Sequence, residues 1–189
     1  SDREGYLRVK SPWYQRTGEE FIGRAFTCAH RVDPEAKLFY NDYNAAVPEK
    51  RERIIKLLRD LLDRGVPVHG MGIQGHWTIY DPSLSEIEAA IEAYAALGLE
   101  VQITELDVSL YHWSDTGNFR VPPPELLSRQ AERYRQIFEL FRRYRGVITG
   151  VTLWGPADDR TWKDNFPVRG RKDWPLLFDE NHRLKTVLL

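Results

Sequence analysis

Two carboxylates stand near the end of an apolar stretch in the middle of the chain. Residues 101–108, VQITELDV, have the β-branched and apolar residues typical of a buried strand, yet they include Glu105 and Asp107. Because strand side chains alternate between two faces, we expect both carboxylates on the same side. Paired carboxyl groups can act as nucleophile or as acid and base, so this pair is the first candidate site.

A second polar pair ends another expected strand. Gln74 and His76 stand two residues apart in VHGMGIQGH, residues 68–76, and should also share a side. Adjacent strands lie about 4.8 Å apart, which lets His76 bridge Glu105 and Asp107. A carboxylate held in such a network stays ionised and oriented, which suits a nucleophile. A structural His–carboxylate triad would have the same residues, so the spacing alone leaves both interpretations open.

Aromatic residues stand near the ends of the expected strands or in the segments that follow them. Their rings could stack on the C–H faces of a sugar, while Asn and Gln side chains serve its hydroxyls. This predicts a carbohydrate cleft, although Trp and Tyr also commonly fill cores and interfaces. No H-x-x-x-H or H-x-H spacing is present, so no metal site is expected. The aromatic residues concerned are Tyr43, Trp77, Trp154, Trp162 and Trp174.

The elements that must position these residues alternate regularly. Helical patterns cover 12–32, 48–64, the segment from Ser83 to Gly98 and a long segment around 127–141. Expected strands cover 37–44, 68–76, 101–108 and 148–155. This order predicts parallel βαβ units and an α/β fold. No glycine-rich phosphate loop follows a strand, which disfavours a nucleotide-binding sheet.

The polar residues favour a (β/α) barrel, because each expected strand carries them at its C-terminal end, where such barrels place their active sites. A closed barrel of this type needs eight strands, and four are found. We therefore expect residues 1–189 to form a single partial domain, about half of a (β/α)8 barrel. Such a half would expose two strand edges, so it should need a partner, either the N-terminal half or a second copy of the chain.

Composition excludes several other classes of protein. The chain is 42% hydrophobic with a formal net charge of −1, and its positive and negative residues are interleaved, so no nucleic-acid partner is expected. No apolar run approaches the roughly 20 residues of a membrane span, so no membrane partner is expected. The lone Cys28 excludes an intramolecular disulfide, and its helical pattern predicts a buried thiol.

The order of the motifs resembles one known family. They are LFYNDYN (38–44), GIQGH (72–76), ITELDV (103–108), VTLWGPADDRTW (151–162) and NFPVRGRKDWPLLFD (165–179). Together they resemble the C-terminal part of the catalytic domain of glycoside hydrolase family 10 endo-1,4-β-xylanases, strands five to eight of the barrel. The resemblance covers nearly all 189 residues.

The resemblance implies a retaining hydrolase of xylan or xylo-oligosaccharides that needs no cofactor. It makes Glu105 the nucleophile, with His76 and Asp107 as its supports. The implied substrate-binding residues are Gln74, Trp154 and Trp162 around the cleavage point and glycone, and Tyr43 and Asn44 on the aglycone side.

One catalytic group has no counterpart in the sequence. Retention needs a second carboxyl group about 5–5.5 Å from the nucleophile. In the family this acid/base Glu lies in a strand-four motif before the region that matches this chain, and Asp42 is the nearest substitute. We therefore expect the chain alone to be inactive or nearly so, and the complete protein to be an endo-xylanase.

Two alternatives stay open. The chain could be a non-catalytic half-barrel that at most binds oligosaccharide, or part of a related barrel glycosidase acting on β-glucans. The sequence is compatible with a cytoplasmic or a secreted enzyme. It does not fix oligomeric state, chain-length preference or whether Ser1 is the natural start.

Overall fold

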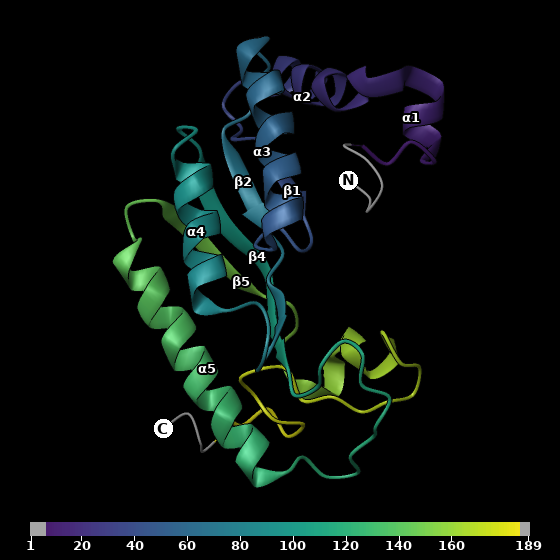
Figure 1. The fold of residues 1–189 in the computed structure, drawn as a ribbon, viewed down its shortest axis with the longest axis vertical. Helices are drawn as coiled ribbons and strands as arrows, with labels where there is room; N and C mark the ends of the chain where they lie inside the picture. The colour runs from purple at the N-terminus through teal and green to yellow at the C-terminus, as the bar shows by residue number, and fades with distance from the viewer. Residues whose placement is uncertain (1–6, 186–189) are drawn as a thin grey trace.

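The molecule is built on a parallel sheet. The computed structural model describes residues 7–185, so the start at Ser1 and the ends of the expected domain range 1–189 lie outside the described residues. Within them the sheet has five strands, of which β4 is the longest (Figure 1). The strands are β1 (Phe39–Asp42), β2 (Gly70–Ile73), β3 (His76–Thr78), β4 (Glu100–Ser109) and β5 (Ile148–Leu153).

All described strand pairs are parallel, as predicted. β2 and β3 follow one another along one side of β4, β5 pairs with its other side, and β1 lies beyond β2. The expected strand 68–76 begins later, at Gly70, and is interrupted at Gln74 and Gly75. Strands 37–44 and 148–155 are found with shorter bounds, whereas strand 101–108 extends one residue further at each end. In the described chain β1 and β5 each pair on one side only, so the sheet is open.

Three helices cover one flank of the sheet. They pack in the order α3, α4, α5, and the last two contact β4 (Figure 1). The sequence signals for their starts are present: Pro48 opens α3, and Ser83 with Glu86 forms a complete capping box on α4. The α-helices are α1 (Pro12–Thr17), α2 (Phe21–Val32), α3 (Pro48–Asp63), α4 (Leu84–Ala95) and α5 (Pro124–Arg143). The short 3-10 helices are η1 (Gly18–Glu20), η2 (Asp158–Arg160) and η3 (Trp162–Asn165).

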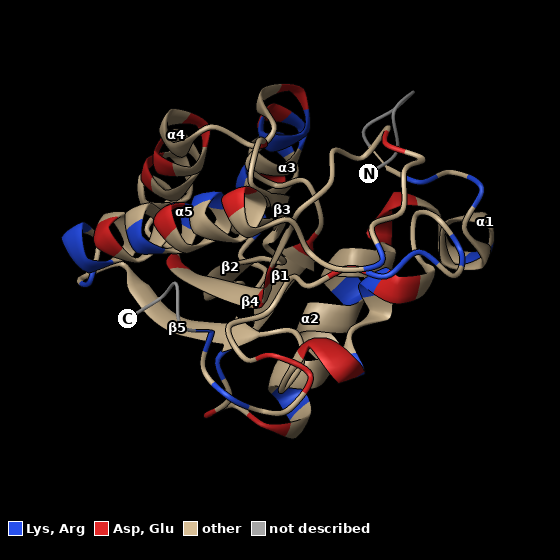
Figure 2. Cartoon of the chain, turned by 90° about the horizontal axis from the view of Figure 1, so that it is seen from below, with Lys and Arg blue, Asp and Glu red and all other residues tan. Residues whose placement is uncertain are grey.

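The core lies between this helical layer and the sheet. Val101 and Ile103 of β4 are fully buried, whereas Gln102 and Thr104 on the opposite face are only half-buried. Positive and negative residues are intermixed along α3 and α5 (Figure 2). Among the described residues no helix combines the length and apolar character needed to cross a membrane.

The prediction of one continuous helix over residues 12–32 is wrong, because the structure has two α-helices there, α1 and α2. Gly18, at a positive φ of 65°, caps the end of α1, and the chain passes through η1 before α2 begins. The prediction that Cys28 is buried is also wrong, because α2 buries Ile22 and Gly23 and leaves Cys28 exposed. The apolar spacing predicted a helix correctly, but it did not predict which face is buried. Gly23 has no side chain, so α2 can approach Leu61 through the face that carries Gly23.

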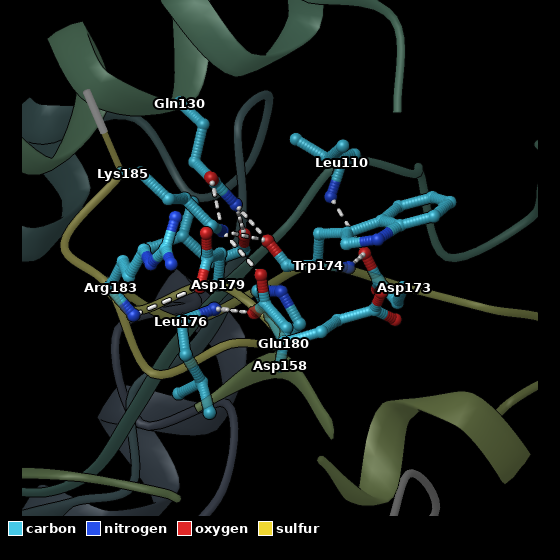
Figure 3. A network of polar contacts seen from close by, with 12 residues as sticks. Leu110, Gln130, Asp158, Asp173, Trp174, Leu176, Asp179, Glu180, Arg183 and Lys185 are labelled. Carbon is cyan, nitrogen blue, oxygen red and sulfur yellow. Dashed lines mark hydrogen bonds and ion pairs between the residues drawn. The ribbon is translucent and has the colours of Figure 1, made fainter. Parts of the chain in front are cut away.

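A buried polar network ties the C-terminal segment to α5 (Figure 3). Lys185 Nζ lies 2.9 Å from Asp158 Oδ2 and donates to Gln130 Oε1 at 3.1 Å and to the Trp174 carbonyl at 2.7 Å. Burial raises the pKa of Asp158 to about 6, while the adjacent Lys185 opposes that rise. Asp158 also accepts the Leu176 amide at 2.9 Å, so the turn after β5 is fixed from two directions.

Candidate active site

A bulge in β4 places the two carboxylates. Ile103 pairs with Val151 and Leu106 pairs with Leu153, so β4 has one more residue than β5 between these pairs. An extra residue reverses the alternation of side chains beyond it. Leu106, rather than Glu105, therefore continues the buried face.

The hydrogen bonds of one side chain confirm this reversal. Thr104 Oγ1 donates to Asn41 Oδ1 at 2.7 Å, and Asn41 Nδ2 donates to Glu105 Oε1 at 3.1 Å. Two consecutive residues of β4 thus contact the same partner on the open face. The bulge is the reason that a buried strand can carry Glu105 and Asp107 at its end.

His76 bridges these carboxylates, as predicted from the spacing. Its Nε2 lies 3.0 Å from Glu105 Oε2 and its Nδ1 lies 3.0 Å from Asp107 Oδ2. When both ring nitrogens carry protons, the imidazolium donates to both carboxylates. His76 comes directly after Gly75, whose positive φ of 80° turns the chain opposite the bulge.

Asp107 lies behind His76 and is fully buried. Besides the contact with His76, its Oδ2 accepts a hydrogen bond from Trp162 Nε1 at 2.8 Å. Lys163 Nζ lies 3.6 Å from its other oxygen, Oδ1. Burial lowers the pKa of Lys163, and the negative charges of Asp107 and Asp173 oppose that change.

A cleft of about 940 Å³ opens in front of Glu105 and His76. Every substrate-binding residue implied by the family resemblance lines it, whereas Asp107 is covered by its partners. The expected residues at its wall are Tyr43, Asn44, Gln74, His76, Glu105, Trp154 and Trp162.

Several wall residues were not predicted. Trp113 and Phe166 are exposed aromatic residues that meet edge to face, with ring centroids 5.9 Å apart, and Phe166 also stacks on Trp162 at 5.1 Å. Both lie outside the strands, so periodicity gave no signal for them. Asn41, at the end of β1, was not predicted either; it contacts Glu105 rather than lining the cleft, and this contact depends on the order of the strands.

Two aromatic residues of the expected sugar platform are buried instead. Trp77 is 4% exposed and packs near Phe141, and Trp174 is 6% exposed. Trp77 alternates with His76 along β3 and therefore points into the core. Trp77 reaches the cleft wall only with the small exposed part of its indole, and Trp174 does not line the cleft.

The described residues offer no good general acid at the cleft. Glu86 accepts two hydrogen bonds from Ser83, which lower its pKa, so it is held as a carboxylate. Asp81 is well exposed and lies 3.4 Å from His112. Asp42, the substitute suggested by the sequence, forms an ion pair with Lys50, with Nζ 2.7 Å from Oδ1, and does not line the cleft.

No cluster of His, Cys, Asp and Glu in the described residues has the arrangement of a metal site. His76 instead bridges Glu105 and Asp107, and Trp162 donates a hydrogen bond to Asp107. The site can therefore hold an oriented carboxylate, Glu105, beside an aromatic cleft.

The family model for glycosyl hydrolase family 10 matches residues 1–188. The chain belongs to this family. A β-1,4-xylanase of Dictyoglomus thermophilum is 53% identical over 188 residues, which are 99% of this chain and 53% of that protein. An endo-1,4-β-xylanase of Geobacillus stearothermophilus is 56% identical over 178 residues, 94% of this chain and 54% of that protein.

Solved family 10 structures share the fold. A mutant protein in complex with xylotriose superposes with a TM-score of 0.94 at 46% identity, covering 99% of this chain and 58% of that one. The chain thus spans about half the length of the relatives it matches. Its parallel sheet and helices are the α/β fold of a partial (β/α)8 barrel, as the sequence predicted.

Proposed function

We propose that this chain is the nucleophile-bearing half of a retaining endo-1,4-β-xylanase, whose substrate is xylan or xylo-oligosaccharide. The observation that carries the proposal is the position of Glu105, held by Asn41 and His76 at the floor of an aromatic cleft. The family membership and the xylanase names of the relatives support the substrate class.

In the proposed reaction Glu105 attacks the anomeric carbon of the sugar in the cleft. The C–O bond to the leaving sugar breaks as the glycosyl–Glu105 ester forms, and an acid protonates the departing oxygen. That same group then takes a proton from water, which attacks the ester, releases the sugar and frees Glu105. His76 and Asp107 act as positioning residues: His76 contacts Glu105 and Asp107 contacts His76, which fixes the orientation of the Glu105 carboxyl group.

The acid must come from outside the described residues, since Asp42, Asp81 and Glu86 are unsuited to the role. We infer that it belongs to the N-terminal half of the barrel, the part of the relatives that this chain does not match. Loss of general acid catalysis typically lowers rates by about 10²–10⁴-fold. The chain alone is therefore expected to be inactive or nearly so.

The aromatic and amide side chains of the cleft would bind the sugars. Trp154 and Trp162 flank His76, with ring centroids 6.2 and 4.8 Å from the imidazole, and would stack near the reacting sugar. Gln74 would bond its hydroxyls. Tyr43 and Asn44, which follow β1 at another part of the cleft wall, would contact the sugar on the leaving side.

The test supplies the other half. The chain is fused to the preceding half of the Geobacillus relative, and reducing-sugar release is measured on xylan and on carboxymethyl-cellulose. We expect xylan hydrolysis by the fusion, little or none by the chain alone, and a loss of about 10⁴-fold or more in Glu105→Gln. A preference for carboxymethyl-cellulose would assign a glucanase instead.

The matched control is Glu100→Gln, at the opposite end of β4, where the carboxylate pairs with Lys37. It should leave turnover nearly unchanged. Hydrolysis that survives Glu105→Gln, or robust activity of the chain alone, would contradict the proposal. An inactive but folded fusion that still binds xylotriose would favour the non-catalytic alternative.

A further inference from the structure

Lys163 is a buried cation whose ammonium faces the supports of Glu105. The side chain is 2% exposed, and its Nζ lies 3.6 Å from Asp107 Oδ1. That oxygen is fully buried and accepts no hydrogen bond within the described part of the chain. A buried carboxylate oxygen without a hydrogen bond is costly, and a facing cation offsets the cost.

Lys163 extends a row of ionisable side chains. His76 lies 3.0 Å from the carboxyl groups of both Glu105 and Asp107, and the Lys163 ammonium faces the other oxygen of Asp107. Asp173 and Arg171 act on Lys163 with opposite signs, and the negative charge of Asp107 also acts on Tyr134 of α5.

The same ammonium also contacts the aromatic wall of the cleft. It lies 4.3 Å from the centroid of the Trp113 ring and 5.0 Å from that of Trp162. Trp113 is exposed and comes from the segment after β4, whereas Trp162 belongs to η3. A cation between two indoles attracts both rings and holds the two segments together.

We propose that Lys163 is a positioning residue that balances the charge of the Asp107–His76–Glu105 network and fixes Trp113 as a substrate-binding wall. The inference rests on the proposed function for its effect on catalysis, but not for its effect on the network. It predicts two separate consequences of removing the charge, one on protonation in the network and one on binding of substrate.

The experiment uses the fusion that completes the barrel. Lys163→Met keeps the length of the side chain and removes its charge, and Lys163→Arg restores a cation. Lys172→Met is the matched control, because Lys172 lies in the following segment and pairs with Asp164 at 2.9 Å and with Glu180 at 3.0 Å, away from Asp107.

Two readouts distinguish charge balance from a merely structural role. The first is the Trp162 indole N–H resonance followed by NMR against pH, since this group donates to Asp107. The second is the pH profile of kcat/KM together with KM on xylan. Removal of a cation favours proton uptake by every neighbouring group, so both the indole titration and the acid limb should move to higher pH by about 1–3 units in Lys163→Met.

We expect KM in Lys163→Met to rise about 2–10-fold as Trp113 loses its cation. Lys163→Arg should restore much of both properties, and Lys172→Met should change neither. Wild-type titration midpoints in Lys163→Met, or equal shifts in Lys172→Met, would overturn the inference. If the wild-type fusion hydrolyses nothing, the proposed function fails, while the indole titration still decides the charge-balancing role of Lys163.

Discussion

At the scale of single residues, the most informative contact is that between Asn41 and Glu105. The amide nitrogen of Asn41 donates to Oε1, while His76 occupies Oε2, so both oxygens of Glu105 have partners in the described structure. A hydrogen bond to each oxygen fixes the orientation of a carboxylate as well as favouring its charge.

We expect Asn41→Leu to lower kcat/KM of the completed barrel by about 10–100-fold, because hydrogen bonds to charged groups contribute about 1.5–3 kcal/mol. Thr104→Val, which removes only the bond that orients Asn41, should have a smaller effect in the same direction. Thr149→Val serves as the control, since its hydroxyl contacts Gln102 and not Glu105. Equal kinetics in Asn41→Leu and Thr149→Val would refute the role of Asn41.

The sequence predicted part of this site and missed part of it for a definite reason. His76, Glu105 and Asp107 could be grouped because two-residue spacing and neighbouring strands suffice to bring them together. The Asn41 contact requires knowing that β1 lies next to β2, and the Lys163 contact requires the path of a segment without periodic structure. Spacing carries information within an element and little about irregular segments.

At the scale of elements, the bulge in β4 lies opposite a glycine whose place a larger residue could not take without a close contact. Gly75 separates β2 from β3 at a positive φ of 80°, and a Cβ there would lie 2.9 Å from Ile103 Cγ2. The irregularities in the two strands face each other and together aim His76 at both carboxylates. The sequence analysis assumed strict alternation of side chains along β4, so it did not predict the bulge in β4 or the turn at Gly75.

Gly75→Ala should therefore lower the free energy of unfolding by about 1–3 kcal/mol and kcat/KM by about 10–100-fold through displacement of His76. Gly98→Ala is the control with matched backbone strain, since its φ is 77° but no atom lies within 4 Å of the added Cβ. It should lower stability by about 1 kcal/mol and leave turnover intact. Urea unfolding and xylan kinetics measure the two effects. Comparable loss of activity in both variants would argue against specific placement of His76.

The network that joins Asp158, Lys185 and Gln130 makes stability depend on pH. Burial raises the pKa of Asp158 from 3.8 to about 6, so between these values the folded state binds more protons than the unfolded state. Its stabilising contribution is complete below about pH 4 and is lost as the pH rises through 6. A shift of about two units corresponds to at most about 3 kcal/mol.

We expect the stability of the wild-type barrel relative to Asp158→Asn to fall as the pH rises from 4 to 6, measured by urea unfolding at each pH. Asp179→Asn supplies a control of opposite sign. The pKa of exposed Asp179 is lowered by hydrogen bonds from the Arg183 and Asn181 amides, so its contribution is lost as the pH falls. A pH-independent difference between wild type and Asp158→Asn would contradict the proposed burial effect.

At the scale of the whole molecule, the sequence predicted both the parallel α/β arrangement and its incompleteness. The four predicted strands correspond to β1, to β2 together with β3, to β4 and to β5. Alternating amphipathic helices and short apolar strands have few other ways to pack. The buried faces were less predictable. The α2 side chains Ala25, Cys28 and Val32 are exposed, and a helical pattern does not say which of its faces is covered within this chain.

The open sheet leads to a prediction about assembly. Val151 on β5 is 36% exposed, and β1 and β5 each leave one edge unpaired in the described structure. Unpaired edges and exposed apolar residues favour association with another chain. We expect the chain alone to self-associate with increasing concentration, and to form a 1:1 complex when the N-terminal half of a relative is supplied.

Light scattering after gel filtration measures both states, and xylan hydrolysis tests whether the 1:1 complex is functional. Val151→Lys places a charge on β5 and should weaken the complex, because the edge must be desolvated when the sheet is extended. Arg59→Glu, which changes the charge at an exposed position of helix α3 rather than on a strand, is the control. A stable dimer of the chain that excludes the added half would instead identify a second copy as the partner, and the cleft would then lack an outside source for its acid.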